Sequence, residues 1–187
     1  MGYIYLYTGN GAGKTTNALG LALRCVGHKK KVVIIQFMKW WKNIGEYKIR
    51  NRLKPYYEIY QFGRPGWLKI RPSRKKVVKI NSMKFKVRKI EEFDKKACKK
   101  ALEFARKIVK KKRPHLLVLD EINLAIHCGL LDVEEVLKFL DEIPEETHVV
   151  LTGRYAPKEL IERADFVNEI NVIKMPKKLI ATEGIQY

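Results

Sequence analysis

The sequence predicts an α/β fold with an open, mostly parallel sheet and helices on both faces. Three observations lead to this prediction. Short apolar runs rich in β-branched residues alternate along the chain with longer segments of helical periodicity, the order expected of β–α units. The interior runs are apolar throughout, as in parallel strands that are buried on both faces. Polar residues follow several of these runs directly, where ligands bind in such sheets.

The first half of the chain supplies two strong strand candidates and one helix. Residues 3–7 form a short apolar run, and residues 31–38 contain VVIIQF, a β-branched run typical of a buried strand. Between them, residues 15–26 place alanines and leucines at helical spacing, and Gly27 is the expected C-cap. Residues 56–62 are a weaker strand candidate.

The second half repeats the alternation. A long amphipathic helix is expected at residues 91–112, ending before Pro114 because the residue that precedes a proline disfavours helical geometry. Further strands are expected at residues 115–119, 147–151 and 166–173. Helices at residues 133–140 and 157–163 separate these strands, and Asp132 is the expected N-cap of the first.

Size and composition favour one globular domain over residues 1–187. The hydrophobic fraction is 46%, which is ordinary for such a domain. No apolar run approaches the ~18 residues of a membrane span, and the N-terminus lacks the features of a secretory signal. Three widely spaced cysteines and four scattered histidines form no metal-ligand or disulfide pattern. A reducing cytoplasm is therefore the expected location.

The net charge of +19 favours an anionic ligand, either nucleic acid or a small molecule that carries a triphosphate. A lysine-rich surface with no ligand is the alternative reading. Residues 69–89 hold ten basic residues and no acidic one. We expect an exposed hairpin there (VVKI, then MKFKV) with Asn81 and Ser82 at its turn. This stretch is either a solvated insertion or a flap over the site that attracts anions.

The strongest motif is TGNGAGKTT at residues 8–16, between the first strand and the first helix. It matches the end of the P-loop pattern G-x-x-x-x-G-K-[ST] at Gly13, Lys14 and Thr15, with Thr8 in place of the first glycine. Glycines allow the backbone to approach phosphates, and the start of the helix adds positive potential. Lys14 would reach phosphate oxygens, and Thr15 would offer its hydroxyl to Mg²⁺.

Other candidate site residues follow the strands at the same edge of the sheet. Asp120 closes an apolar strand, as a Walker B acid does, and would hold Mg²⁺ through water, opposite Thr15; a simple helix or turn cap after the strand is the alternative. Glu121 is the next residue, and in hydrolases such a glutamate activates water. Arg154 follows another strand, where it would sense phosphate or lie on the surface.

Two further groups of residues have open roles. Arg24 lies on the first helix, close to three turns beyond Lys14, and either approaches a nucleotide or forms surface ion pairs. Trp40 and Trp41 follow the second strand, and either pack internally or face a large flat ligand.

Several motifs in the same order resemble the ATP:corrinoid adenosyltransferases of the RecA-like P-loop type. They are YTGNGAGKTT, LALRCVGH, VVIIQFMK, VLDEI, VVLTGR and EGIQY. The resemblance covers most of the chain and is weakest over residues 41–95. The combination of the loop with QF, LDE and TGR is specific, since LDE alone occurs widely.

The resemblance implies a reaction and its substrates. The 5′-deoxyadenosyl group of ATP would pass to the Co(I) of a reduced corrinoid, cob(I)alamin or a precursor, and triphosphate would leave. The loop would cradle this leaving group with Mg²⁺ or Mn²⁺ held by Thr15 and Asp120. Lys14, Asp120 and Glu121 would be the catalytic residues, and the corrinoid would supply the reactive chemistry.

The resemblance also implies a binding set. It comprises Gly9, Asn10, Gly11, Ala12, Gly13, Lys14, Thr15, Thr16, Arg24, Arg154 and Trp67. Trp67 would correspond to an aromatic residue against the corrin ring, and Glu121 would lie near the ribose or the metal. Ala12 stands where many members carry a lysine. The chain begins almost at its first strand, so the stretch 69–89 is a candidate substitute for an N-terminal lid.

The resemblance further implies a homodimer, with a flavoprotein reductant as a candidate partner and no membrane. Two other function classes stay open from the residues alone. A RecA-like ATPase that binds nucleic acid would suit the charge and the fold, although no separate nucleic-acid motif is visible. A small-molecule kinase would use a mobile basic lid, for which the stretch 69–89 is the candidate.

Overall fold

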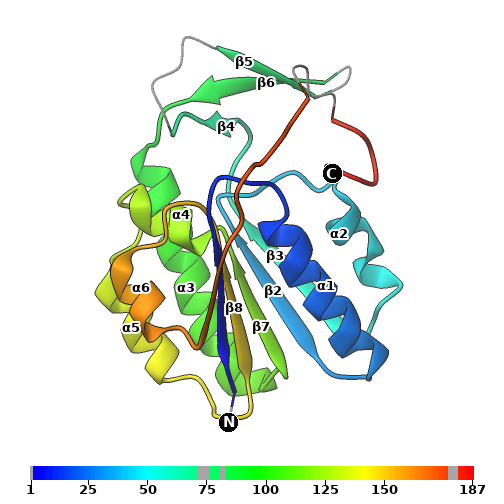
Figure 1. The fold of residues 1–187 in the computed structure, drawn as a ribbon, viewed down its shortest axis with the longest axis vertical. Helices are drawn as coiled ribbons and strands as arrows, with labels where there is room; N and C mark the ends of the chain where they lie inside the picture. Colours follow the sequence, from blue (N-terminus) through cyan, green and yellow to red (C-terminus); the bar gives the residue numbers. More distant parts are fainter. Residues whose placement is uncertain (1, 71–75, 81–82, 177–180) are drawn as a thin grey trace.

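The computed structural model describes residues 2–70, 76–80, 83–176 and 181–187 of the chain. Its centre is a six-stranded sheet in which every pairing is parallel. The strands are β1 (Ile4–Thr8), β2 (Val32–Phe37), β3 (Tyr57–Phe62), β7 (Leu116–Asp120), β8 (His148–Thr152) and β9 (Phe166–Glu169). Their order is β3-β2-β7-β8-β1-β9, so β8 separates the strand before the loop from the strand that ends at Asp120 (Figure 1).

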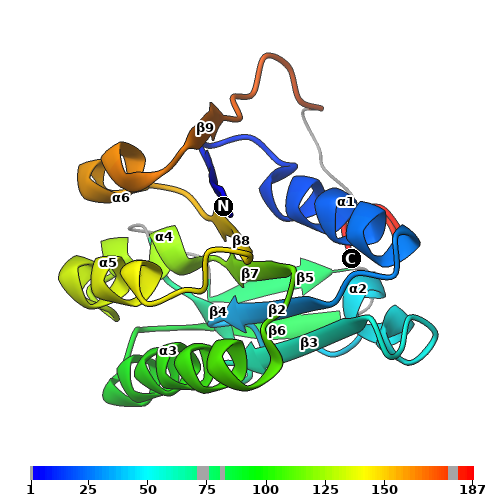
Figure 2. The same cartoon turned by 90° about the horizontal axis from the view of Figure 1, so that it is seen from below.

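Helices cover both faces of this sheet, as the sequence predicts (Figure 2). The helices are α1 (Lys14–Gly27), α2 (Gly45–Lys48), α3 (Glu92–Lys112), α4 (Ile122–His127), α5 (Val133–Asp141) and α6 (Lys158–Arg163), with a 3₁₀ turn at Ile49–Asn51. Figure 2 shows α1 and α2 on one side and α3 to α6 on the other. Asp132 caps α5, since its carboxylate accepts the N–H of Glu134 at 2.8 Å. No helix in these ranges is long and apolar enough to cross a membrane.

Each face of the sheet has its own core because side chains alternate along a strand. Val33 and Ile35 of β2 face α3, α4 and α5. Val32 and Ile34 face α1, where the small side chains of Ala18 and Ala22 are fully buried. All six residues of β2 are therefore buried, which explains the continuous apolar run in its sequence.

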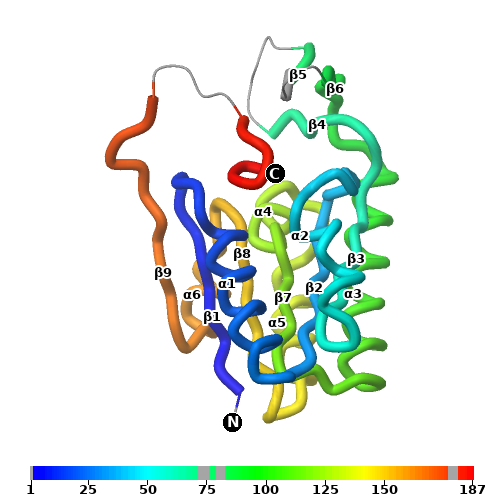
Figure 3. The backbone as a smooth tube through the Cα atoms, turned by 90° about the vertical axis from the view of Figure 1, so that its right-hand side faces the viewer, coloured from blue at the N-terminus to red at the C-terminus, as the bar shows by residue number. Residues whose placement is uncertain are grey.

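A second, three-stranded sheet lies beyond the carboxyl ends of the main strands (Figures 1 and 3). It comprises β4 (Trp67–Leu68), β5 (Val77–Ile80) and β6 (Met83–Arg88), with β5 and β6 antiparallel. This pair confirms the predicted hairpin, while its turn and residues 71–75 lie outside the described residues. Val78 and Phe85 are direct partners and share the face toward the main sheet, whereas Lys84 and Lys86 are exposed.

The hairpin is tied to the start of α3 by a buried ion pair. Arg88 donates to both carboxylate oxygens of Asp94 at 2.7 Å, and the Asp94 side chain is 2% exposed. Asp94 also accepts the N–H of Glu91 at 3.0 Å, which completes a capping box at the N-terminus of α3. Arg88 is thus a structural residue of the basic stretch, and its charge is already neutralised.

Most predicted element ends lie within one residue of the observed ends, and two of the differences affect the path of the chain. Gly27 is the last residue of α1 and not its cap, because the chain leaves the helix through His28 and turns left-handed at Lys29 (φ 55°). The last strand ends at Glu169 and not at residue 173, since the Ile170 carbonyl turns to accept the N–H of Gly11 at 2.7 Å. Short elements without a clear periodicity, namely β4, α2 and α4, were not predicted.

Candidate active site

The glycine-rich loop is shaped by its contact with the end of β9. Gly9 has a φ of +92°, and a Cβ there would lie 2.4 Å from the Ile170 carbonyl oxygen. A Cβ on Gly11 would lie 2.7 Å from the same oxygen. Gly13 begins α1 with a φ of +115°, a value that favours glycine. The N–H of Gly11 points to Ile170, so this amide is not among those turned inward.

Lys14 lies inside the loop, where its ammonium donates to the carbonyl oxygens of Gly9 at 2.9 Å and Gly11 at 2.5 Å. Burial lowers the pKa of Lys14, Glu121 opposes this effect, and Arg154 adds to it. Asn10, Ala12 and Thr16 are exposed to solvent. Loop carbonyls therefore hold the buried ammonium of Lys14 inside the loop.

Thr8, the departure from the P-loop pattern, has a structural contact. Its hydroxyl accepts the N–H of Ala156 at 3.3 Å, and its carbonyl accepts the N–H of Ile170 at 2.9 Å. These bonds join the start of the loop to the connection after β8 and to the end of β9. The bond to Ala156 needs the threonine hydroxyl, which a glycine lacks, whereas the bond to Ile170 uses the backbone carbonyl and does not depend on the side chain.

Asp120, at the end of β7, is fully buried and accepts four hydrogen bonds. Thr15 and Thr152 donate to its Oδ1 at 2.8 and 2.7 Å. Gln36 and Lys39 donate to its Oδ2 at 3.0 and 2.6 Å. Burial raises the pKa of Asp120, but Lys39 and the hydroxyl hydrogen bonds lower it overall, so the carboxylate stays ionised.

Lys39 is a site residue that the sequence analysis missed. It follows β2 within FMKW, and its side chain is 29% exposed. Its pKa is raised, because the attraction of Asp120 and Glu121 outweighs the opposing effect of burial. A lysine two residues after a strand carries no motif, so only its place at the carboxyl edge of the sheet would have indicated it.

Glu121 adopts a left-handed backbone conformation (φ 67°), which is uncommon for a residue with a Cβ. The Thr152 hydroxyl holds this turn by accepting the N–H of Glu121 at 3.0 Å. The buried Oε2 of Glu121 has no hydrogen-bond partner among the described residues. Burial and the charge of Asp120 raise the pKa of Glu121, while Lys39, Arg154 and Lys14 oppose that rise.

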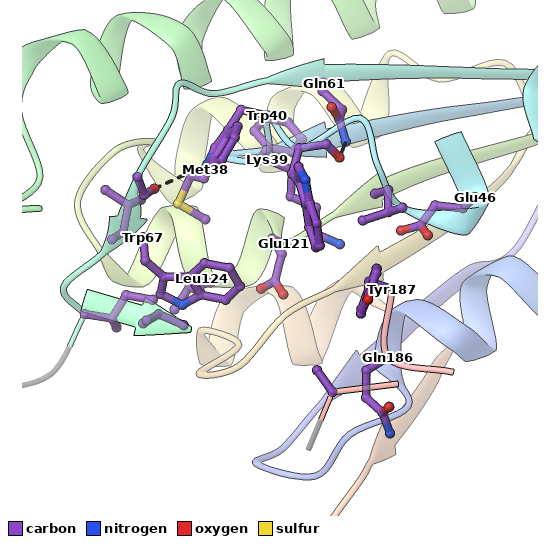
Figure 4. Close-up of a pocket in the computed structure, with 18 of the residues that line it drawn as sticks. Met38, Lys39, Trp40, Glu46, Gln61, Trp67, Glu121, Leu124, Gln186 and Tyr187 are labelled. Carbon is purple, nitrogen blue, oxygen red and sulfur yellow. Dashed lines mark hydrogen bonds between the residues drawn. The ribbon is translucent and has the colours of Figure 1, made fainter. Parts of the chain in front are cut away.

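A pocket of about 450 Å³ opens beside these charged groups, between the main sheet and the small one (Figure 4). Its charged lining residues are Lys39, Glu46, Glu121 and Arg154. The rest is largely aromatic and aliphatic, a composition typical of small-molecule sites. Those lining residues include Phe37, Met38, Trp40, Trp41, Ile44, Trp67, Leu68, Ile70, Val78, Leu124 and Tyr187.

Phe85 of the hairpin organises the tryptophans of this pocket. Its ring centroid lies 5.5 Å from Trp40, 5.3 Å from Trp41 and 6.3 Å from Trp67. Trp41 also contacts Tyr187 of the C-terminal segment at 5.0 Å. Trp40 and Trp41 therefore both pack internally and face the pocket. Tyr187 also lines the pocket, although in the sequence it was noted only as part of the EGIQY motif.

The predicted site residues are not all brought together. Lys14, Thr15, Asp120, Glu121 and Arg154 converge around the carboxyl ends of β1, β7 and β8. Trp67 lies on β4 at the pocket, 44% exposed. By contrast, Arg24 is exposed on the last turn of α1, about 15 Å along the helix from Lys14 at ~1.5 Å per residue.

The donor set around Thr15 and Asp120 fits Mg²⁺. Magnesium in nucleotide sites takes one or two carboxylates together with water and substrate phosphates. Thr15 and Asp120 supply a hydroxyl and an ionised carboxylate 2.8 Å apart, next to the phosphate loop. In the described part of the chain no three His, Cys, Asp or Glu side chains group as a metal cage.

Comparison with known proteins identifies the family. A family model described as ATP:corrinoid adenosyltransferase BtuR/CobO/CobP matches residues 1–187. The corrinoid adenosyltransferase of Escherichia coli (strain K12) is 34% identical over 174 residues, which cover 92% of this chain and 78% of that protein. The corrinoid adenosyltransferase of Sinorhizobium sp. is 33% identical over 190 residues, covering 100% of this chain and 80% of that protein. With its loop, its strand-end acid and its full-length match, the chain belongs to the ATP:corrinoid adenosyltransferase BtuR/CobO/CobP family.

Proposed function

We propose that this chain performs the adenosyl transfer of its family with the triphosphate of ATP seated in the loop of residues 8–16 and the corrinoid at the aromatic pocket. The transfer of an adenosyl group from ATP to a cobalt corrinoid follows from family membership. The assignment of each substrate to a place rests on one observation. Lys39, Glu121 and Arg154 line the aromatic pocket and also interact with the charged groups at the phosphate end, which supports one continuous site.

The chemistry needs no nucleophile from the protein. The Co(I) of the reduced corrinoid attacks C5′ of ATP, a cobalt–carbon bond forms, and the C5′–O5′ bond breaks. The cobalt gives up an electron pair, and the electron pair of the broken bond leaves on triphosphate. The protein's tasks are to hold the two substrates in line, to exclude water and to stabilise the charge that gathers on the leaving group.

We assign Lys14 to stabilise the negative charge on the leaving triphosphate. It is buried in the loop, and its ammonium donates hydrogen bonds to two loop carbonyls that a phosphate could replace. A cation held in a water-poor site stabilises a departing anion more strongly than one in water. Arg154, whose charge opposes the rise in the pKa of Glu121, would add a second positive charge at the same edge.

We assign Mg²⁺, or Mn²⁺, to Thr15 and Asp120. When bound, the cation would neutralise charge on the triphosphate. Asp120 orients the Thr15 hydroxyl by accepting its hydrogen bond at 2.8 Å, which leaves a lone pair of that oxygen free for a ligand. Glu121, with one buried oxygen unpaired among the described residues, is placed to receive a polar group of the nucleotide.

Other properties are proposals on the resemblance to the family alone. They are a homodimer, a cytoplasmic location and a flavoprotein that reduces the cobalt. Arg24 is proposed as a nucleotide contact on the same basis. Because Arg24 is exposed and far along α1 from the loop, it would contact a part of the nucleotide that lies outside the loop. Trp67 is proposed to lie against the corrin ring, consistent with its partly exposed place at the pocket.

The test is an anaerobic assay with ATP, Mg²⁺ and chemically reduced cobalamin, followed by the absorbance change on adenosylation. We expect adenosylcobalamin and triphosphate in equal amounts. Lys14→Ala should lower the rate at least about 100-fold, since one donor to a developing negative charge contributes at this level. Lys107→Ala, which removes an exposed lysine of α3, is the matched control and should leave the rate unchanged.

Two results would contradict the proposal. Full activity in Lys14→Ala would separate the loop from the leaving group. Production of ADP and phosphate without an adenosylated corrinoid, above all if stimulated by a polynucleotide, would favour the ATPase reading instead.

A further inference from the structure

Lys39 is held against Asp120 by an unusual turn at the end of β2. Met38 has a φ of 60°, a conformation disfavoured for a residue with a Cβ. Its N–H is fixed by the Phe62 carbonyl at 2.9 Å, and the backbone of Gly63 packs so closely that a Cβ there would lie 2.5 Å from Met38. The turn brings the Lys39 ammonium 2.6 Å from Oδ2 of Asp120.

This ammonium is the counter-charge of the acid. In the described part of the chain, Lys39 is the one cation within ion-pair distance of Asp120, whose other three partners are neutral donors. A carboxylate offers about four acceptor positions, and the four hydrogen bonds to Asp120 use them. With these positions in use, Asp120 can take a divalent cation only when one of its four donors leaves.

The surroundings of Lys39 carry more negative charge. Glu121 and Glu46 line the same pocket as Lys39, and their negative charges, like that of Asp120, raise the pKa of this lysine. Gln36 joins two of these carboxylates, since its amide donates to Glu46 at 3.3 Å and to Asp120 at 3.0 Å. Without the lysine, this negative charge would favour the binding of another cation at Asp120.

We propose that the Lys39 ammonium takes the place of the metal beside Asp120 when no ligand is bound. It neutralises Asp120, and so keeps the affinity for a free divalent cation low until the triphosphate arrives. This inference rests on the proposed metal site at Thr15 and Asp120. When the nucleotide brings its cation, Lys39 is released toward the pocket, whose wall it already lines. Lys39 is thus a positioning residue that couples metal binding to ATP binding.

The test is Mn²⁺ binding to the whole chain without nucleotide, measured as the loss of the free-ion signal in electron paramagnetic resonance. Wild type should bind Mn²⁺ alone weakly. Lys39→Met should gain one saturable site per chain with an affinity at least about tenfold higher, because a unit charge a few ångströms from a cation contributes more than this near a protein surface. Lys42→Met, which removes an exposed lysine three residues away, should behave as wild type.

Two more variants keep the test decisive. Lys39→Gln removes the charge but keeps a donor for Asp120, which protects the fold if Lys39→Met unfolds. It should gain the same Mn²⁺ site, whereas Lys39→Arg should restore the weak binding of wild type. The new site should vanish in Lys39→Met/Asp120→Asn.

The inference and the proposed metal site fail in different ways. If folded Lys39→Met and Lys39→Gln gain no Mn²⁺ site, while Asp120→Asn weakens Mn²⁺-dependent ATP binding, the inference is wrong and the metal site stands. If Asp120→Asn leaves the Mn²⁺ dependence of ATP binding unchanged, the metal is held elsewhere and both are wrong.

Discussion

At the scale of single residues, the glycines of the loop are explained by close backbone approach as much as by phosphate binding. The end of β9 crosses the loop at Ile170, and its carbonyl oxygen leaves no room for a Cβ on Gly9 or Gly11. Gly20, in the middle of α1, is different, because a Cβ added there would meet no atom within 4 Å. The two kinds of glycine should therefore respond in opposite directions to alanine.

Gly9→Ala should destabilise the protein by about 1–3 kcal/mol, since the backbone there is left-handed and the added methyl meets a carbonyl oxygen. It should also weaken ATP binding, because relief of the clash requires the loop to move. Gly20→Ala should stabilise by about 0.5–1 kcal/mol. Urea unfolding of both variants checks the pair. Equal effects of the two substitutions would show that the contact with Ile170 does not shape the loop.

At the scale of elements, the basic hairpin covers the pocket and is held to α3 by an ion pair. Its apolar face, with Val78 and Phe85, turns toward the pocket, and its described lysines at positions 84 and 86 are exposed. The hairpin therefore lies beside the pocket, where a flap would lie. Its lysines at positions 84 and 86, however, point away from the pocket. The Arg88–Asp94 ion pair joins the hairpin to the start of α3.

Asp94→Asn tests this anchor and its pH dependence. Burial raises the pKa of Asp94, but hydrogen bonds from Arg88 and the Glu91 N–H, with the charges of Arg88 and Arg64, lower it overall. A lowered folded pKa means that the ionised carboxylate contributes stability above the unfolded pKa of about 4. That stability is lost as the pH falls through the folded value. The substitution should cost about 3–5 kcal/mol at pH 7.

The measurement is urea unfolding from pH 7 downward. The difference between wild type and Asp94→Asn should shrink steadily below about pH 4, as the wild-type carboxyl is protonated. Asp141→Asn is the control, since its ion pair with Arg163 is exposed and should contribute under about 1 kcal/mol. A difference that stayed constant with pH would show that Asp94 acts through packing and not through its charge.

At the scale of the whole molecule, the site lies at the end of the sheet that carries the C-terminal segment, opposite the N-terminus (Figures 1 and 3). The chain as a whole carries a net charge of +19. Only part of that charge lies in the site, in Lys14, Lys39 and Arg154. The remainder either draws anionic ATP toward the site or belongs to a lysine-rich surface with no such role.

Ionic strength distinguishes these two readings. If the charge steers ATP, its association rate should fall roughly three- to tenfold between about 20 and about 300 mM KCl, because salt screens the attraction over about a Debye length. Stopped-flow tryptophan fluorescence would follow the binding, with uncharged adenosine as the control ligand. An association rate that does not change with salt would show that the net charge does not steer ATP to the site.

The sequence predicted the elements whose signals are local. The buried strands, α1, α3 and the cap at Asp132 follow from side-chain periods and from residue types that act within one turn. The loop at residues 8–16 followed from a motif within nine consecutive residues. The family assignment rested on the same local motifs in their order, and the full-length match confirmed it.

The tertiary structure alone decided which distant residues meet. Lys39 and Asp120 are 81 positions apart, and they form a pair because β2 and β7 are neighbours in register. Thr15 with Asp120 and Tyr187 with Trp41 are also far apart in the sequence, and they meet because the fold brings α1 and the C-terminal segment to the same edge of the sheet. A pattern along the chain records what each side chain faces within its own element. Contacts between elements depend on strand order and on register, which no single stretch of sequence specifies.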